Sequence, residues 1–129
     1  MFYMMANISA LVNTKWYLGI PLNDSQNLRL GIAEFGTRIV GDNLLAMQIG
    51  NEPDLYAGHD KRPKSYTEWD YFGEYGVVVD ALRTQTNVST VGNFIAPSVA
   101  TGDWTPERVW DTNFIPHYID SLYALAVEQ

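Results

Sequence analysis

The run LLAMQIG at residues 44–50 decides the fold class of this chain. It follows a turn at Asp42-Asn43 and leads directly into Asn51-Glu52-Pro53. A nearly continuous apolar run of this length, bounded by turn residues, is typical of a strand that is buried on both faces. Such strands belong to parallel sheets, so the run predicts an α/β protein.

Strands and helices alternate on both sides of this run. Further short apolar runs predict strands at Lys15–Pro21, Asn93–Ala96 and Tyr123–Val127. Capping residues and helical spacing predict helices between them. The first expected helix is Met1–Val12, and the second runs from a cap at Asp24 or Ser25 to Gly41. The third runs from a capping box of Ser65 and Glu68 to about Arg83, with Trp69 on its buried face. A fourth begins at Thr105-Pro106, and a short fifth helix is opened by Pro116 and runs through Leu122.

This order favours a parallel sheet with helical crossovers. A strand and its helix together span about thirty residues, which is typical of a (β/α)8 barrel, and a closed barrel takes ~250 residues. Four strands therefore predict a partial TIM barrel, with residues 1–129 forming a fragment of one domain. The last strand is apolar and has no capping element after it, so we expect an open hydrophobic edge.

Composition excludes several classes of function. The formal net charge of −7 is the reverse of what a protein that tracks the nucleic-acid backbone needs, so we expect no nucleic-acid partner. No apolar run is long enough to predict a membrane span. The absence of cysteine excludes a thiol nucleophile and a zinc finger. Met1–Val12 lacks the basic start of a signal peptide, whereas the sequons at Asn7, Asn23 and Asn87 weakly favour a secretory route.

The tripeptide Asn51-Glu52-Pro53 carries the clearest chemical signal. It follows a buried parallel strand, at the end where barrel enzymes place their catalytic groups. A partly desolvated Glu52 suits a general acid, and the amide of Asn51 can bind a sugar hydroxyl beside it. The alternative is a turn that ends the strand and leaves the glutamate in solvent.

The sequence around this tripeptide resembles glycoside hydrolase family 79, which contains fungal β-glucuronidases and heparanase-like enzymes. Residues 48–56, QIGNEPDLY, are similar to the family's acid/base strand, and WYLGIPLN at residues 16–23 resembles the strand before it. The stretches DYFGE at 70–74, IAPS at 95–98 and ALAVE at 124–128 resemble elements that follow. The resemblance implies strands three to six of a (β/α)8 barrel, a retaining mechanism and an extracellular enzyme.

The resemblance also implies roles for individual residues. It makes Glu52 the acid/base and Asn51 the partner of the sugar 2-hydroxyl. It places the nucleophile, a second glutamate, at the end of strand seven, beyond the strand at Tyr123–Val127. Glu128 follows that strand and is expected to support the site rather than to act as the nucleophile.

Other polar residues are weaker candidates for substrate contacts. Asn23 and Ser98 end two strands, and for each a cap or turn role is as well supported as sugar binding. Tyr56 can stack on a sugar ring or pack its own loop. The basic cluster Lys61, Arg62 and Lys64 can attract a uronic-acid carboxylate, although a solvated loop surface is the simpler interpretation.

No cofactor or metal site is expected, because His59 and His117 lie far apart in the sequence and neither has a second histidine at ligand spacing. The leading hypothesis is therefore a β-glucuronidase-like segment that binds a uronic-acid-containing glycan. The alternatives are a catalytically inert remnant, because a second carboxylate is needed for turnover, and a weak carbohydrate-binding α/β module. The sequence leaves the oligomeric state open.

Overall fold

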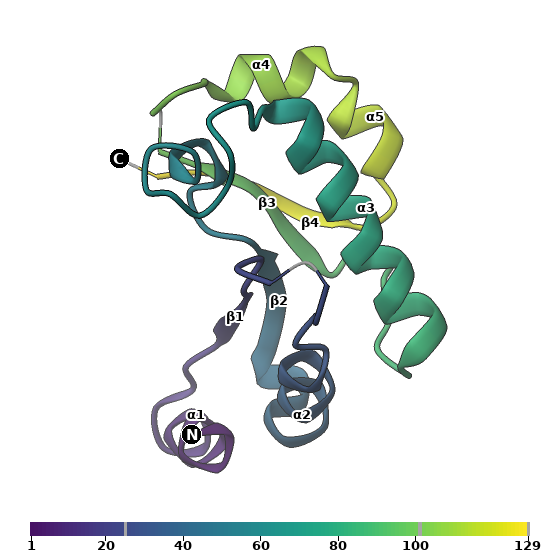
Figure 1. Cartoon of the computed structure of the whole chain (residues 1–129). Coiled ribbons are helices and arrows are strands. Elements are labelled where there is room, and N and C mark those ends of the chain that lie inside the picture. Colours follow the sequence, from purple (N-terminus) through teal and green to yellow (C-terminus); the bar gives the residue numbers. More distant parts are fainter. Residues whose placement is uncertain (25, 101, 129) are drawn as a thin grey trace.

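The computed structural model describes residues 1–24, 26–100 and 102–128. Four parallel strands form one sheet in the order β1-β2-β3-β4, and helices connect them (Figure 1). The chain is therefore an α/β protein with an all-parallel sheet, as the sequence predicts. In chain order the elements are α1 Phe2–Val12, β1 Trp16–Ile20, α2 Gly31–Val40, β2 Leu44–Ile49, α3 Glu68–Gln85, β3 Phe94–Val99, α4 Pro106–Asp111, α5 Phe114–Tyr118 and β4 Leu122–Val127, with 3-10 turns at Gly41–Asn43 and Pro53–Leu55.

Strand β2 lies inside the sheet, between β1 and β3. Its residues Ala46 to Ile49 are buried on both faces of the sheet. This explains why the strand is apolar on both faces, apart from the hydrogen-bonded Gln48. The register places Ile20 beside Ile49, and Gln48 beside Ile95. The carboxyl ends of β1, β2 and β3 therefore meet at one edge of the sheet.

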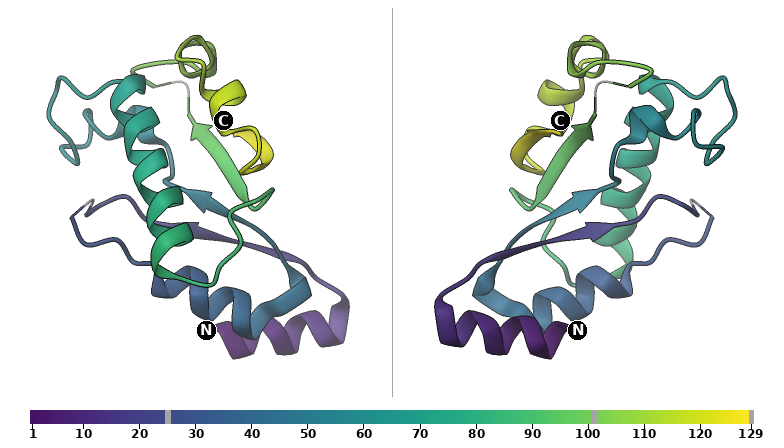
Figure 2. Two further views of the ribbon diagram at one scale, coloured as in Figure 1. Left: turned by 90° about the vertical axis from the view of Figure 1, so that its right-hand side faces the viewer. Right: turned by 90° about the vertical axis from the view of Figure 1, so that its left-hand side faces the viewer.

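Aromatic side chains fix α3 against the sheet. Tyr71 and Tyr75 are fully buried on this helix and pack against Phe114 of α5, with ring centroids 5.8 and 4.9 Å away. Each phenol also keeps a hydrogen bond: Tyr71 donates to the carbonyl of Ile49, and Tyr75 pairs with Ser121. These bonds satisfy the buried hydroxyls, whose burial would otherwise destabilise the fold. The long helix lies along the sheet in both side views (Figure 2).

Two predicted helix starts are wrong. Helix α2 begins at Gly31, so Asp24 does not cap it; the carboxylate of Asp24 instead accepts the N–H groups of Gln26 and Asn27 in a turn. The alternative cap, Ser25, lies outside the described residues. Helix α5 begins at Phe114, so Pro116 stands inside its first turn, where its missing N–H breaks no hydrogen bond, rather than opening it.

The capping box of α3 lies two residues later than predicted. Thr67 and Asp70 form it, rather than Ser65 and Glu68, and the backbone N–H of Thr67 donates to Asp70 at 2.8 Å. Glu68 is buried instead and pairs with Arg108 of α4 at 2.9 Å. Trp69 lies outside the buried face of α3 and is 59% exposed, so its predicted place in the core is wrong.

The two outer strands carry exposed apolar side chains. Strand β4 exposes Tyr123, Leu125 and Val127 by about half, at alternating positions. Within the described residues β4 pairs only with β3, and β1 only with β2. Among those residues, none of the helices has both the length and the apolar character needed to cross a bilayer.

Candidate functional site at the carboxyl edge of the sheet

Glu52 lies just beyond the carboxyl end of β2. The chain leaves the strand through Gly50, whose φ of +75° is unfavourable for other residues, and a Cβ there would stand 3.0 Å from Leu22. Glu52 itself adopts a left-handed conformation, with φ 48° and ψ 55°. Its N–H donates to the carbonyl of Ser98 at the end of β3, at 2.9 Å. A non-glycine residue held in this region stores ~1–3 kcal/mol of strain, which is common where a side chain must be aimed at a site.

An amide and a carboxylate join β2 to the end of β4 at the carboxyl edge of the sheet. The side-chain amide of Gln48 donates to Asn51 Oδ1 at 2.9 Å and to Glu128 Oε1 at 3.1 Å. Gln48 is buried, Glu128 is half-buried and Asn51 is exposed. The structure therefore brings together two of the predicted site residues, Asn51 and Glu128, through a third residue that the sequence analysis did not consider.

These three side chains line one hollow of about 580 Å³ on the sheet. Its walls come from β1, β3 and β4, including Tyr17, Ile95 and Leu125. Polar groups at one end and apolar strand residues along the side suit a sugar, which presents hydroxyl edges and an apolar face.

A buried ion pair anchors the loop that follows Glu52. Arg62 bonds Glu74 of α3 at 2.8 Å, with both side chains less than a fifth exposed. The same guanidinium donates to the carbonyl of Leu22, beyond β1. The charge and hydrogen bond of Glu74 outweigh burial and raise the pKa of Arg62, which therefore stays charged.

Tyr56 connects this anchor to the site. Its ring lies 5.5 Å from the Arg62 guanidinium, and its hydroxyl accepts the N–H of Asn51 at 3.2 Å. Burial raises the pKa of the phenol. Of the two roles considered for Tyr56, the structure gives direct support to packing of the loop.

Asp54 fastens the loop after β2 to the loop after β3. Its carboxylate is fully buried and accepts the N–H groups of Ala100 at 3.0 Å and Gly102 at 2.5 Å. A Cβ at Gly102 would overlap the Leu55 side chain and crowd the Asp54 carboxylate, so a larger residue there would require both to shift. Asp54 lies two residues after Glu52 in sequence, but its partners are more than 40 residues away and no local pattern indicates them.

The remaining strand-end candidates lie at the same edge without touching the hollow. Asn23 is exposed in the bend after β1. Ser98 is fully buried, with φ 54°, and its hydroxyl has no partner among the described residues. The contribution of Ser98 that the structure does show is its carbonyl, which holds the N–H of Glu52.

The basic cluster does not present three free charges. Arg62 is paired with Glu74, and Lys64 donates to the carbonyl of Ala57 and lies 3.1 Å from Asp60. Lys61 alone makes no ion pair within the described residues. His59 is exposed in the same loop, whereas His117 packs against Phe72 of α3. The described part of the chain contains no group of three potential metal ligands.

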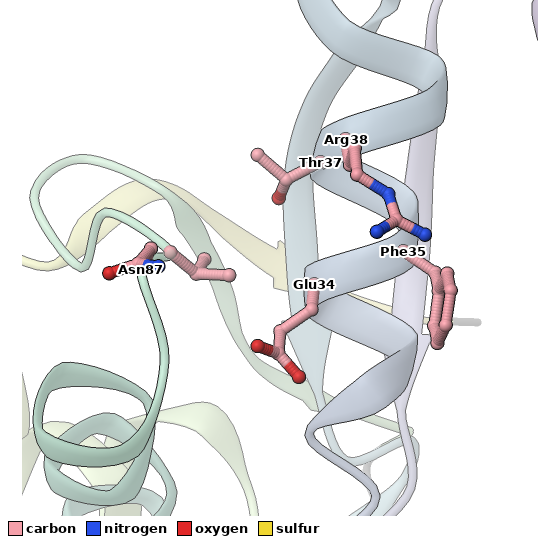
Figure 3. Close-up of a pocket in the computed structure, with 6 residues that line it drawn as sticks. Glu34, Phe35, Thr37, Arg38 and Asn87 are labelled. Atoms are coloured by element: carbon pink, nitrogen blue, oxygen red, sulfur yellow. The ribbon is translucent and has the colours of Figure 1, made fainter.

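A second hollow, of about 300 Å³, lies between α2 and the segment that precedes β3 (Figure 3). Phe35 and Arg38 stack on each other there, and Glu34 and Asn87 line the same hollow. Asn87 comes before β3 and Arg38 comes before β2, so this hollow is at the amino end of the strands. That end of a parallel α/β sheet is seldom the site of chemistry.

The geometry described above is the main evidence about the function of this chain, because comparison with known proteins adds none. No protein-family model matches the chain, and no curated protein matches it significantly in sequence.

Proposed function

We propose that this chain carries the acid/base half of a retaining β-glycosidase of the (β/α)8 type, similar to glycoside hydrolase family 79 and acting on β-glucuronides. The observation that carries the proposal is the hydrogen-bonded group of Gln48, Asn51 and Glu128 at the carboxyl edge of four parallel strands, with Glu52 next to Asn51 in the chain. Barrel glycosidases bind substrate at this edge. The choice of a uronide rests on the sequence resemblance.

In this proposal Glu52 protonates the leaving oxygen and then activates water, as a retaining mechanism requires. The strained backbone of Glu52 and its bond to Ser98 support this role, because they restrict where the carboxyl group can point. Asn51 binds a hydroxyl of the sugar next to the reacting carbon.

Retention also needs a nucleophilic carboxylate about 5–5.5 Å from the acid. Glu128 is hydrogen-bonded to Gln48, so we assign it to positioning. We propose that the nucleophile is a glutamate on a further strand outside residues 1–129. The open reading frame around this chain tests that part: a frame that continues into a strand-end glutamate supports it, and a closed frame favours the inert remnant.

The site itself is testable in the chain as it stands. We expect 4-nitrophenyl β-D-glucuronide to shift the NMR signals of Asn51, Glu52 and Gln48 without releasing nitrophenol. Asn51→Ala should weaken binding about tenfold, because it removes one hydrogen bond to a partly buried ligand. Asn87→Ala, in the hollow of Figure 3, is the matched control and should bind as the wild type does.

Two results would contradict this proposal. Signal shifts around Asn87 instead of Asn51 would place the ligand at the wrong end of the strands. Turnover by the chain that Glu52→Gln abolishes would show that the nucleophile is already present within residues 1–129.

A further inference from the structure

We propose that the carboxylate of Glu128 sets the direction of the Asn51 side-chain amide, through Gln48, so that Asn51 offers N–H donors and not its carbonyl to the ligand. The inference rests on the proposed function for the nature of that ligand. The orientation itself follows from the three side chains alone.

The direction begins at Glu128. An ionised carboxylate can only accept hydrogen bonds, so the group that faces it must be a donor. Gln48 therefore turns its Nε2 toward Glu128 Oε1, at 3.1 Å. The reversed amide would bring two acceptor oxygens together in a largely buried position, which is costly.

The orientation of the Gln48 amide then determines the orientation of the Asn51 amide. Nε2 of Gln48 carries two hydrogens, and the second points to Asn51 Oδ1 at 2.9 Å. If the Asn51 amide were reversed, its NH₂ group would face this donor. Oδ1 of Asn51 is thus occupied, and its Nδ2 forms no hydrogen bond within the described part of the chain.

The orientation of Asn51 restricts which ligand atoms can bind beside it. Asn51 borders the 580 Å³ hollow, so the ligand atom that it meets there must accept a hydrogen bond. A hydroxyl oxygen or a carboxylate oxygen fits this requirement, whereas a ligand N–H does not. Gln48 and Glu128 are then positioning residues that act through Asn51, although 80 residues separate them in sequence.

The orientation is measurable without any ligand. The exchange of side-chain NH₂ protons with water can be measured in the ¹⁵N-labelled protein. We expect the two protons of Gln48 to exchange at least tenfold more slowly than those of the exposed Gln26, because both Gln48 protons are hydrogen-bonded. Glu128→Gln should reduce this protection, because a glutamine at 128 also adopts the orientation in which its NH₂ group faces Gln48 and cannot accept its hydrogen bond. Equal exchange of Gln48 and Gln26 in the wild type would overturn the inference, whether or not a sugar binds.

The effect on the ligand is separated from a general loss of structure by a double-mutant cycle. Gln48→Met and Glu128→Gln should each lower the affinity for 4-nitrophenyl β-D-glucuronide about tenfold, while its 2-deoxy analogue, which lacks the accepting hydroxyl, should bind all forms alike. The double variant should lose no more than either single variant, because both act through the same amide. Additive losses that are equal for the two sugars would contradict a positioning role.

Failure of the proposed function would be distinguishable. If neither sugar binds but Gln48 is more protected in the wild type than in Glu128→Gln, the orientation stands and the glycosidase proposal fails. If the sugars bind with Gln48 unprotected, the glycosidase proposal stands and this inference fails.

Discussion

At the scale of single residues, Asp54 contributes most directly to the shape of the site. Asp54 comes two residues after Glu52, and its buried carboxylate holds two backbone N–H groups of the loop after β3. Hydrogen bonds to a charged group stabilise a protein by ~1.5–3 kcal/mol. The position of Glu52 relative to β3 therefore depends on a residue that takes no part in the proposed chemistry.

Asp54→Asn should lower the free energy of unfolding by ~1.5–3 kcal/mol, because an amide has one acceptor atom and would turn its NH₂ toward the second backbone donor. Urea denaturation followed by fluorescence measures this change. Asp60→Asn is the matched control, since Asp60 is exposed and its ion pair with Lys64 lies at the surface; we expect a change within ~0.5 kcal/mol. Equal effects of the two substitutions would show that the two N–H contacts contribute little.

At the scale of elements, the ion pair of Arg62 and Glu74 ties the loop of residues 53–67 to α3 and to the end of β1. Tyr66 adds a hydrogen bond to the same carboxylate at 2.9 Å. Burial and the nearby negative charge of Glu74 raise the pKa of this phenol, so it remains a donor. One carboxylate on the helix thus organises the loop that carries Tyr56.

Glu74→Gln should destabilise the fold by ~3 kcal/mol, because it leaves the Arg62 guanidinium buried without a counter-charge. Asp80→Asn on the same helix removes the exposed pair with Arg83 and should cost less than ~0.5 kcal/mol. Thermal unfolding of both variants makes the comparison. The interpretation fails if Glu74→Gln unfolds at the wild-type temperature.

The elements also show which features of the fold the sequence predicts and which it does not. All four strands were predictable, because each is a short apolar run beside turn residues, although only β2 and β3 are largely buried. The cap of α3 was not, because Ser65 with Glu68 and Thr67 with Asp70 both fit a cap-and-acid spacing. In the structure Thr67 and Asp70 form the box, whereas Glu68 is paired with Arg108 of α4, a contact that local sequence does not reveal. For the site, the position of Glu52 was predictable from its strand, but the Gln48–Glu128 bond was not, because it requires the strand order.

At the scale of the whole molecule, the two outer strands leave the sheet open in the described residues. Open edges present unpaired backbone groups that favour association with another strand. The apolar side chains of Tyr123, Leu125 and Val127 add to this tendency on β4. The net charge of −7 acts in the opposite direction, because like-charged molecules repel one another.

These opposing terms make self-association dependent on salt. Repulsion weakens as the Debye length falls from about 30 Å at 0.01 M to about 8 Å at 0.15 M, while the edge contacts are barely screened. We expect the average mass in sedimentation velocity to rise with salt. Leu125→Lys should reduce association by placing a charge on the β4 edge. Val91→Lys makes the same change of charge in the loop before β3, where Val91 is 73% exposed, and should leave most of the association intact. A wild-type chain that stays monomeric at both salt concentrations would show that its edges are protected without a partner.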